Sequence, residues 1–233
     1  MLAFLVFSIF DFAVELILLL LDLDESPAGV FLGGLCVVTA VFLIAGVVFR
    51  KLGITWNDVG FAGSFVWKGI GDAIFWGIAI YIISLPFSYI SGQILAPQSD
   101  PYLKLLLDSR NIMSVAMVVM IIVVLVPVAT EILFRGILQT ALRGKLRLLS
   151  CIFTVNILFA AIHVSPGNYI PVFVAGALLS WFYEKRRSLI LVAVASATWH
   201  MPAVILTLFT FVAGVGMDST YAEGDRLTPI LFS

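Results

Sequence analysis

Long, continuous apolar segments dominate this chain of 233 residues and limit the folds open to it. Hydrophobic residues make up 62% of the sequence and charged residues 12%, and the mean hydropathy is +1.14. Several windows approach 20 apolar residues, the length at which a helix crosses the bilayer core. A transmembrane β-barrel would instead show alternating segments of about ten residues. The sequence therefore predicts an all-α, polytopic transmembrane bundle and excludes a soluble domain.

Hydropathy predicts about seven transmembrane helices, separated by connections rich in Gly, Pro and charged residues. The predicted ranges are 2–21, 28–49, 65–90, 112–142, 148–164, 169–184 and 188–212. Residues 100–108 are expected to form a short helix in the membrane interface, and residues 217–233 a polar tail. The first range has no basic start and no small-residue cleavage site, so we interpret it as a retained span rather than a signal peptide.

Basic residues predict the orientation in the membrane. Eight of the 13 Lys and Arg lie in the second, fourth and sixth connections, whereas the first connection holds only acids and the fifth holds no charge. The positive-inside rule places those basic connections and the N-terminus in the cytoplasm. We expect a multi-pass protein of a prokaryotic plasma membrane, in contact with lipid. The net charge of −1 argues against a nucleic-acid partner.

Three predicted spans carry ionisable residues at similar depths. Counted from the cytoplasmic ends of their helices, Glu131 and His200 lie roughly 18 Å deep and His163 roughly 22 Å. Ionisable groups inside lipid are costly and usually functional. We therefore expect these three side chains to meet in a central polar cavity. Arg135 lies one turn from Glu131 and is predicted to pair with it.

One carboxylate and two imidazoles can activate water. Glu131 can serve as general base, and a histidine can orient the water or stabilise an oxyanion. Glu131, His163 and His200 also match the two-His, one-Glu ligand set of a catalytic zinc site, so zinc stays an open alternative. A purely structural interpretation stays open as well, in which each histidine bonds to a backbone carbonyl.

The motifs around these residues resemble the CPBP intramembrane proteases, also called the Abi or type II CAAX prenyl protease family. That family carries Glu-Glu-x-x-x-Arg, Phe-x-x-x-His and His-x-x-x-Asn or Asp on three helices. Residues 130–136 are similar to the first motif, 159–163 (from Phe159) match the second in full, and 200–204 match the third in part. The resemblance covers about residues 112–210. It divides the chain into N-terminal spans (1–111), a protease core (112–210) and a tail (211–233).

The resemblance implies an intramembrane endopeptidase that hydrolyses membrane-associated peptides or proteins. Family precedent suggests prenylated C-termini, signal or pheromone peptides, or bacteriocin-related targets as substrates. Glu131 would be the base or a water ligand, His163 and His200 would position water and oxyanion, and Arg135 would hold the helix pair.

Two positions depart from the family pattern. Thr130 stands where the family has its first Glu, and Val204 stands where it has Asn or Asp. A threonine hydroxyl is no equivalent base, and valine donates no hydrogen bond. A second hypothesis is therefore a catalytically silent member that binds membrane peptides or proteins. A third is a small ion-coupled transporter that uses the acids of the first and third spans, Asp11, Glu15 and Asp72.

Overall fold

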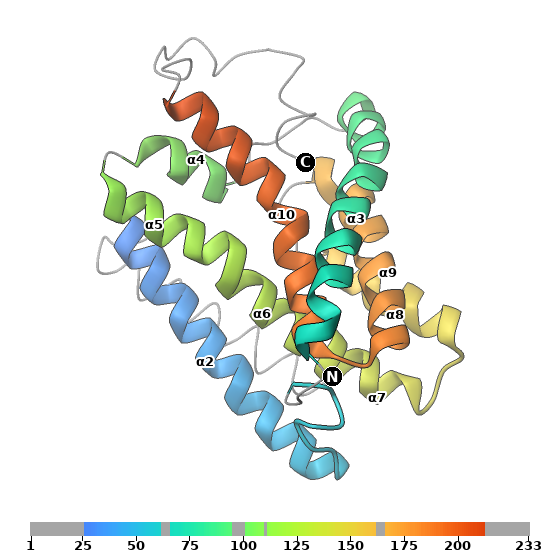
Figure 1. The fold of residues 1–233 in the computed structure, drawn as a ribbon. Helices are drawn as coiled ribbons and strands as arrows, with labels where there is room; N and C mark the ends of the chain where they lie inside the picture. Colours follow the sequence, from blue (N-terminus) through green and yellow to red (C-terminus); the bar gives the residue numbers. More distant parts are fainter. Residues whose placement is uncertain (1–25, 62–65, 95–100, 110, 162–165, 213–233) are drawn as a thin grey trace.

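The structure, a computed structural model, describes residues 26–61, 66–94, 101–109, 111–161 and 166–212. No β-strand occurs within these ranges, and the described chain is a bundle of helices (Figure 1). The all-α prediction is confirmed there. The first predicted span and the polar tail lie outside the described residues. The elements are α2 (Pro27–Leu52), α3 (Val66–Ile94), α4 (Pro101–Asp108), α5 (Ile112–Met120), η1 (Ile121–Leu125), α6 (Val126–Glu131), η2 (Ile132–Gln139), α7 (Thr140–Arg143), α8 (Leu148–Ala161), η3 (Pro166–Asn168), α9 (Tyr169–Arg186) and α10 (Leu189–Val212).

The predicted helix ends lie within a few residues of the observed ones, because the sequence carries clear end signals. The Ser26 hydroxyl accepts a hydrogen bond from the Gly29 amide at 3.0 Å and caps α2, with Pro27 at its first position. The same helix ends at Gly53, whose φ of 66° is the left-handed conformation that glycine adopts easily. The short helix expected at 100–108 is α4.

In the part of the chain that the structure describes, four helical segments are long and apolar enough to cross a membrane: Pro27–Leu52, Lys68–Ile94, Ile112–Arg143 and Leu189–Phe209. They make the chain an integral membrane protein. Helices α8 and α9, which correspond to two further predicted spans, are not among these four segments. Helix α8 has 14 described residues, fewer than a membrane span needs, and α9 ends in a charged turn. The total of seven spans therefore stays a prediction.

The segment Ile112–Arg143 is one continuous helix with two π-helical stretches in it. Both η1 and η2 are π-helical, and η1 ends two residues before Pro127. A proline ring clashes with the carbonyl four residues earlier, and the wider π turn relieves that crowding. Wide turns of this kind concentrate at functional sites. The second one carries Arg135.

Helix α10 lies in the middle of the bundle, between α2, α5 and α6 on one side and α3, α8 and α9 on the other (Figure 1). It packs most extensively against α3. A Cβ added to Gly77 of α3 would lie 2.5 Å from the Ala195 carbonyl oxygen and 2.5 Å from Thr198 Cβ. The absence of a side chain there lets the two helix backbones approach closely, as is common in membranes.

The three basic connections lie at one end of the bundle, the lower end in Figure 1. The Leu189 amide donates to the Val59 carbonyl at 3.0 Å, and the Ser188 hydroxyl donates to the Gly60 carbonyl at 3.1 Å. These bonds tie the connection after α2 to the turn between α9 and α10. The basic connections therefore lie on one side of the bundle, as the alternation of basic and non-basic connections along the sequence predicts. The assignment of this side to the cytoplasm stays a prediction.

Candidate active site

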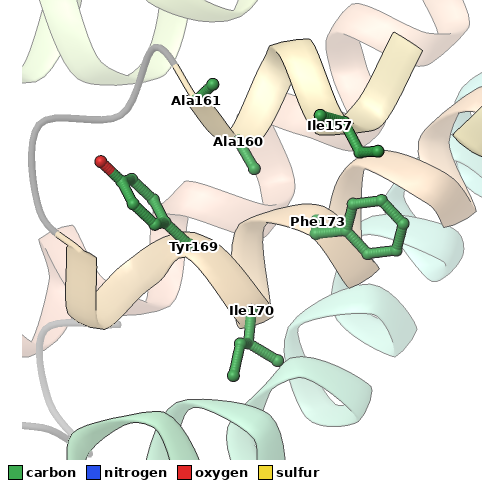
Figure 2. Close-up of a pocket in the computed structure, with 6 residues that line it drawn as sticks. All are labelled: Ile157, Ala160, Ala161, Tyr169, Ile170 and Phe173. Atoms are coloured by element: carbon green, nitrogen blue, oxygen red, sulfur yellow. The ribbon is translucent and has the colours of Figure 1, made fainter. Parts of the chain in front are cut away.

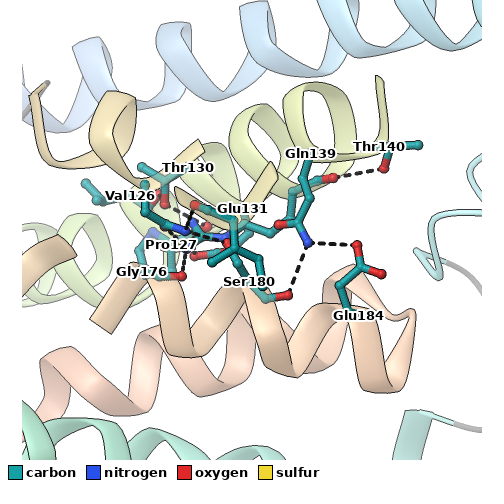
Figure 3. Close-up of polar contacts among 12 residues, drawn as sticks. Val126, Pro127, Thr130, Glu131, Gln139, Thr140, Gly176, Ser180 and Glu184 are labelled. Carbon is teal, nitrogen blue, oxygen red and sulfur yellow. Dashed lines mark hydrogen bonds and ion pairs between the residues drawn. The ribbon is translucent and has the colours of Figure 1, made fainter. Parts of the chain in front are cut away.

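A ladder of polar side chains runs down the buried face of η2 and its neighbours. Its members recur at every fourth position and face α9, where small and acidic residues recur at the same interval (Figure 3). They are Glu131, Arg135, Gln139 and Arg143 on one side and Gly176, Ser180 and Glu184 on the other.

The predicted pair of Glu131 and Arg135 is confirmed. Arg135 Nη1 donates to Glu131 Oε1 at 3.2 Å, and Arg135 Nε lies 3.1 Å from Oε2. The second contact is an ion pair without hydrogen-bond geometry, so Oε2 accepts no hydrogen bond from any described residue. Both side chains are buried: 0% of the Arg135 side chain and 1% of the Glu131 side chain is exposed. Removal of one member of such a pair typically costs about 3–5 kcal/mol, because the other charge stays buried.

Arg135 has further partners on α8 and α9. Its Nη2 donates to the Gly176 carbonyl at 2.9 Å and lies 3.5 Å from Asn156 Oδ1. Its guanidinium lies over the Phe159 ring, 4.7 Å from the ring centre. Phe159, the first residue of the second family motif, therefore provides a cation–π contact. These contacts reduce the cost of a cation among apolar helices.

Asn156 and Gly176 form the wall behind Arg135. The Asn156 amide donates to the Ile152 carbonyl at 2.7 Å and to the Ser180 hydroxyl at 3.0 Å. A Cβ added to Gly176 would lie 2.4 Å from Asn156 Oδ1. Only glycine leaves room for this amide and for the guanidinium that reaches the Gly176 carbonyl.

The lower half of the ladder ends near the basic turns. Gln139 Nε2 donates to the Ser180 carbonyl at 3.1 Å and to Glu184 Oε1 at 3.0 Å. The same Oε1 accepts from Arg143 Nε at 3.2 Å, and Arg187 binds Oε2 at 2.6 Å. Sequence reasoning missed Gln139, Asn156, Ser180 and Glu184. Polar residues recur every four positions from Glu131 to Arg143, and this spacing could have predicted that Gln139 lies on the same helix face.

His200 lies on α10, half-buried, with its ring centre 4.5 Å from that of Trp199. One turn earlier, the buried Ser196 hydroxyl lies beside the Glu131 carboxylate. Residues four apart share a helix face, so α10 presents His200 one turn beyond Glu131. The comparable depths of these two residues in the membrane stay a prediction.

The two positions that depart from the family pattern are occupied in different ways. The Thr130 hydroxyl donates to the Val126 carbonyl at 2.8 Å, so it bonds to its own helix. Val204 is 1% exposed and belongs to an apolar cluster with Leu106, Val118 and Ile122. Neither position supplies a group that can exchange protons with water at neutral pH.

His163 lies outside the described residues, between Ala161 at the end of α8 and Pro166 at the start of η3. Beside these two ends is an apolar pocket of about 410 Å³, whose lining residues include Ala160, Tyr169 and Phe173 (Figure 2). The central polar cavity expected around Glu131, His163 and His200 stays a prediction.

Asp72, one of the acids named for the transporter hypothesis, forms an ion pair with Arg186 and so joins α3 to α9. The other two acids, Asp11 and Glu15, lie outside the described residues.

The surroundings of Glu131 do not fit the alternative of a zinc ligand set. Both of its carboxylate oxygens lie within 3.2 Å of guanidinium nitrogens, and a divalent cation there would be repelled by that charge. Within the described ranges, no three His, Cys, Asp or Glu side chains are grouped as metal ligands.

Residues 112–201 match the family model described as type II CAAX prenyl endopeptidase Rce1-like. The predicted family resemblance is confirmed over this segment. The Rce1-like segment begins at the first residue of α5 and includes Glu131, His163 and His200. No curated protein and no solved structure matches the chain.

The wall behind Arg135 in the Rce1-like segment gives a stability prediction. Gly176→Ala forces a methyl group against Asn156 and Phe159, and we expect it to lower the free energy of unfolding by about 1–3 kcal/mol. Gly46→Ala in α2 is the control, because a Cβ there has no neighbour within 4 Å. The control should be neutral or stabilising by up to about 1 kcal/mol. Thermal unfolding in detergent measures both, and equal effects would contradict the close packing at Gly176.

Proposed function

We propose that this chain is a CAAX-protease-type intramembrane endopeptidase that hydrolyses peptide bonds in membrane-associated substrates. The observation that carries the proposal is the Rce1-like match, because it includes all three residues assigned to the chemistry. The buried pair of Glu131 and Arg135 supports it, since ionisable groups at such depth are usually functional.

In the proposed mechanism, Glu131 is the general base. Its Oε2, which accepts no hydrogen bond from a described residue, takes a proton from water. The water oxygen attacks the scissile carbonyl, and His163 and His200 orient the water and donate to the oxyanion. The carbon–nitrogen bond then breaks, and the proton held by Glu131 passes to the leaving amine. Arg135 keeps Glu131 in position.

We further propose the arrangement around this chemistry. The chain has seven spans, with the N-terminus in the cytoplasm, and the protease core extends over 112–210. Residues 1–111 supply the preceding spans, and 211–233 form a tail. His163 completes a polar cavity with Glu131 and His200 inside the bundle.

The alternative is a catalytically silent protein that binds membrane peptides or partner proteins. Two observations favour it. The Thr130 hydroxyl is bonded to its own helix, and Val204 is packed among apolar side chains. In this alternative the pair of Glu131 and Arg135 is retained because it holds the helices together.

The direct test is cleavage of a fluorogenic peptide with a prenylated C-terminus by the purified full chain in liposomes. We expect measurable hydrolysis by the wild type and a loss of about 10²–10⁴-fold in Glu131→Gln, because a general base is removed. His163→Ala and His200→Ala should lose activity as well.

Ser150→Ala is the matched control, since Ser150 is exposed at the start of α8. It should leave the rate unchanged. Thermal unfolding of each variant separates loss of chemistry from loss of fold. No hydrolysis by the wild type, or full activity in folded His163→Ala, would refute the protease assignment.

The silent alternative predicts that the missing groups can be restored. Thr130→Glu combined with Val204→Asn should create or raise hydrolysis, whereas Thr130→Gln with Val204→Asn should not, because glutamine is no base. Both double variants carry Val204→Asn and so bury the same asparagine side-chain amide. They should therefore lose similar stability. If wild-type hydrolysis is already fast and the glutamate double adds nothing, the alternative fails.

A further inference from the structure

Two basic turns lie side by side at one end of the bundle. The end of α7 and the turn after it supply Arg143, Lys145 and Arg147, and the end of α9 supplies Lys185, Arg186 and Arg187. Glu184 joins the turns, because Arg143 and Arg187 bind its two carboxylate oxygens at 3.2 and 2.6 Å.

Acidic residues neutralise only part of this charge. Glu184 engages Arg143 and Arg187, and Asp72 engages Arg186. Among the described residues, six cations against these two carboxylates leave four positive charges uncompensated. Lys145 and Arg147 are exposed and form no ion pair with any described residue, and Lys185 is exposed as well. The surface therefore carries a concentrated positive charge.

Aromatic residues beside these turns indicate the depth of the surface in the membrane. Lys185 Nζ lies 5.5 Å from the centre of the Trp181 ring. The ring centres of Trp181 and Trp76, which belongs to α3, are 5.2 Å apart. Trp181 is 38% exposed. Tryptophan is enriched where lipid chains meet headgroups, and a lysine one turn further on extends toward the headgroups.

The basic turns are also held in a defined shape. Arg143 Nη1 donates to the Leu146 carbonyl at 3.0 Å, which closes the first turn. Ser188 and Leu189 bond to the connection after α2 at 3.1 and 3.0 Å and so fix the second. A preformed cation cluster loses little entropy when it binds an anion.

We propose that these two turns form a binding site for the headgroup of an anionic phospholipid. Its phosphate binds the three cations that pair with no described carboxylate, Lys145 and Arg147 on one turn and Lys185 on the other, and its acyl chains extend along the apolar surface beside Trp181. Charge complementarity and the depth set by the tryptophan favour this occupant over a soluble anion. The site is independent of the proposed peptidase chemistry.

The test is lipid binding to the full chain in neutral detergent, measured by native mass spectrometry. Phosphatidylglycerol should bind at least about tenfold more tightly than phosphatidylcholine with the same acyl chains. Lys145→Gln with Arg147→Gln should weaken phosphatidylglycerol binding by about 25-fold, at about fivefold for each cation. Higher NaCl should weaken it as well.

Lys104→Gln is the matched control, because Lys104 is an exposed lysine on α4, away from the basic turns. It should leave phosphatidylglycerol binding unchanged. Lys185→Gln gives a second variant if the double mutant is unstable, with an expected loss of about fivefold. Equal affinity for the two lipids, or unchanged binding in these variants, would overturn the proposal. Displacement of the lipid by inorganic phosphate would also overturn it, since that identifies a site for soluble anions.

Discussion

A buried arginine governs the arrangement of this bundle. Arg135 is fully buried in a long apolar helix, and a charge in that position is tolerated only when partners surround it. Its contacts come from three sources: Glu131 on its own helix, Asn156 on α8 and the Gly176 carbonyl on α9. Satisfying one guanidinium therefore fixes the relative positions of three helices, and with them the carboxylate proposed as the base.

Much of this arrangement is predictable from the sequence, because its signals are local. Hydropathy predicts the helices, Ser26 and Gly53 mark the ends of α2, and a spacing of four residues predicts the pair of Glu131 and Arg135. The rest depends on contacts between helices. Nothing near Asn156 in the sequence indicates that it faces an arginine 21 residues earlier. The π-helical winding of η2 likewise depends on packing that single-sequence patterns do not contain.

The contacts of Glu131 are compatible both with an active peptidase and with a catalytically silent protein. A carboxylate paired with a guanidinium is held firmly, which suits a positioned base and equally suits a structural pair. Glu131 keeps one oxygen without a hydrogen bond, whereas Thr130 and Val204 are satisfied within the helices. The proposed mechanism therefore assigns the base to Glu131, since neither altered position offers a carboxylate.

The most direct test of this account is a double-mutant cycle on unfolding free energy with Glu131→Gln, Arg135→Gln and the double variant. If the buried pair organises the three helices, each single variant leaves an unpaired charge and the double variant removes both. The double should then cost less than the sum of the singles, with a coupling energy of about 1–3 kcal/mol. Additive effects, within about 0.5 kcal/mol, would contradict the claim that this ion pair is the interaction on which the structure depends.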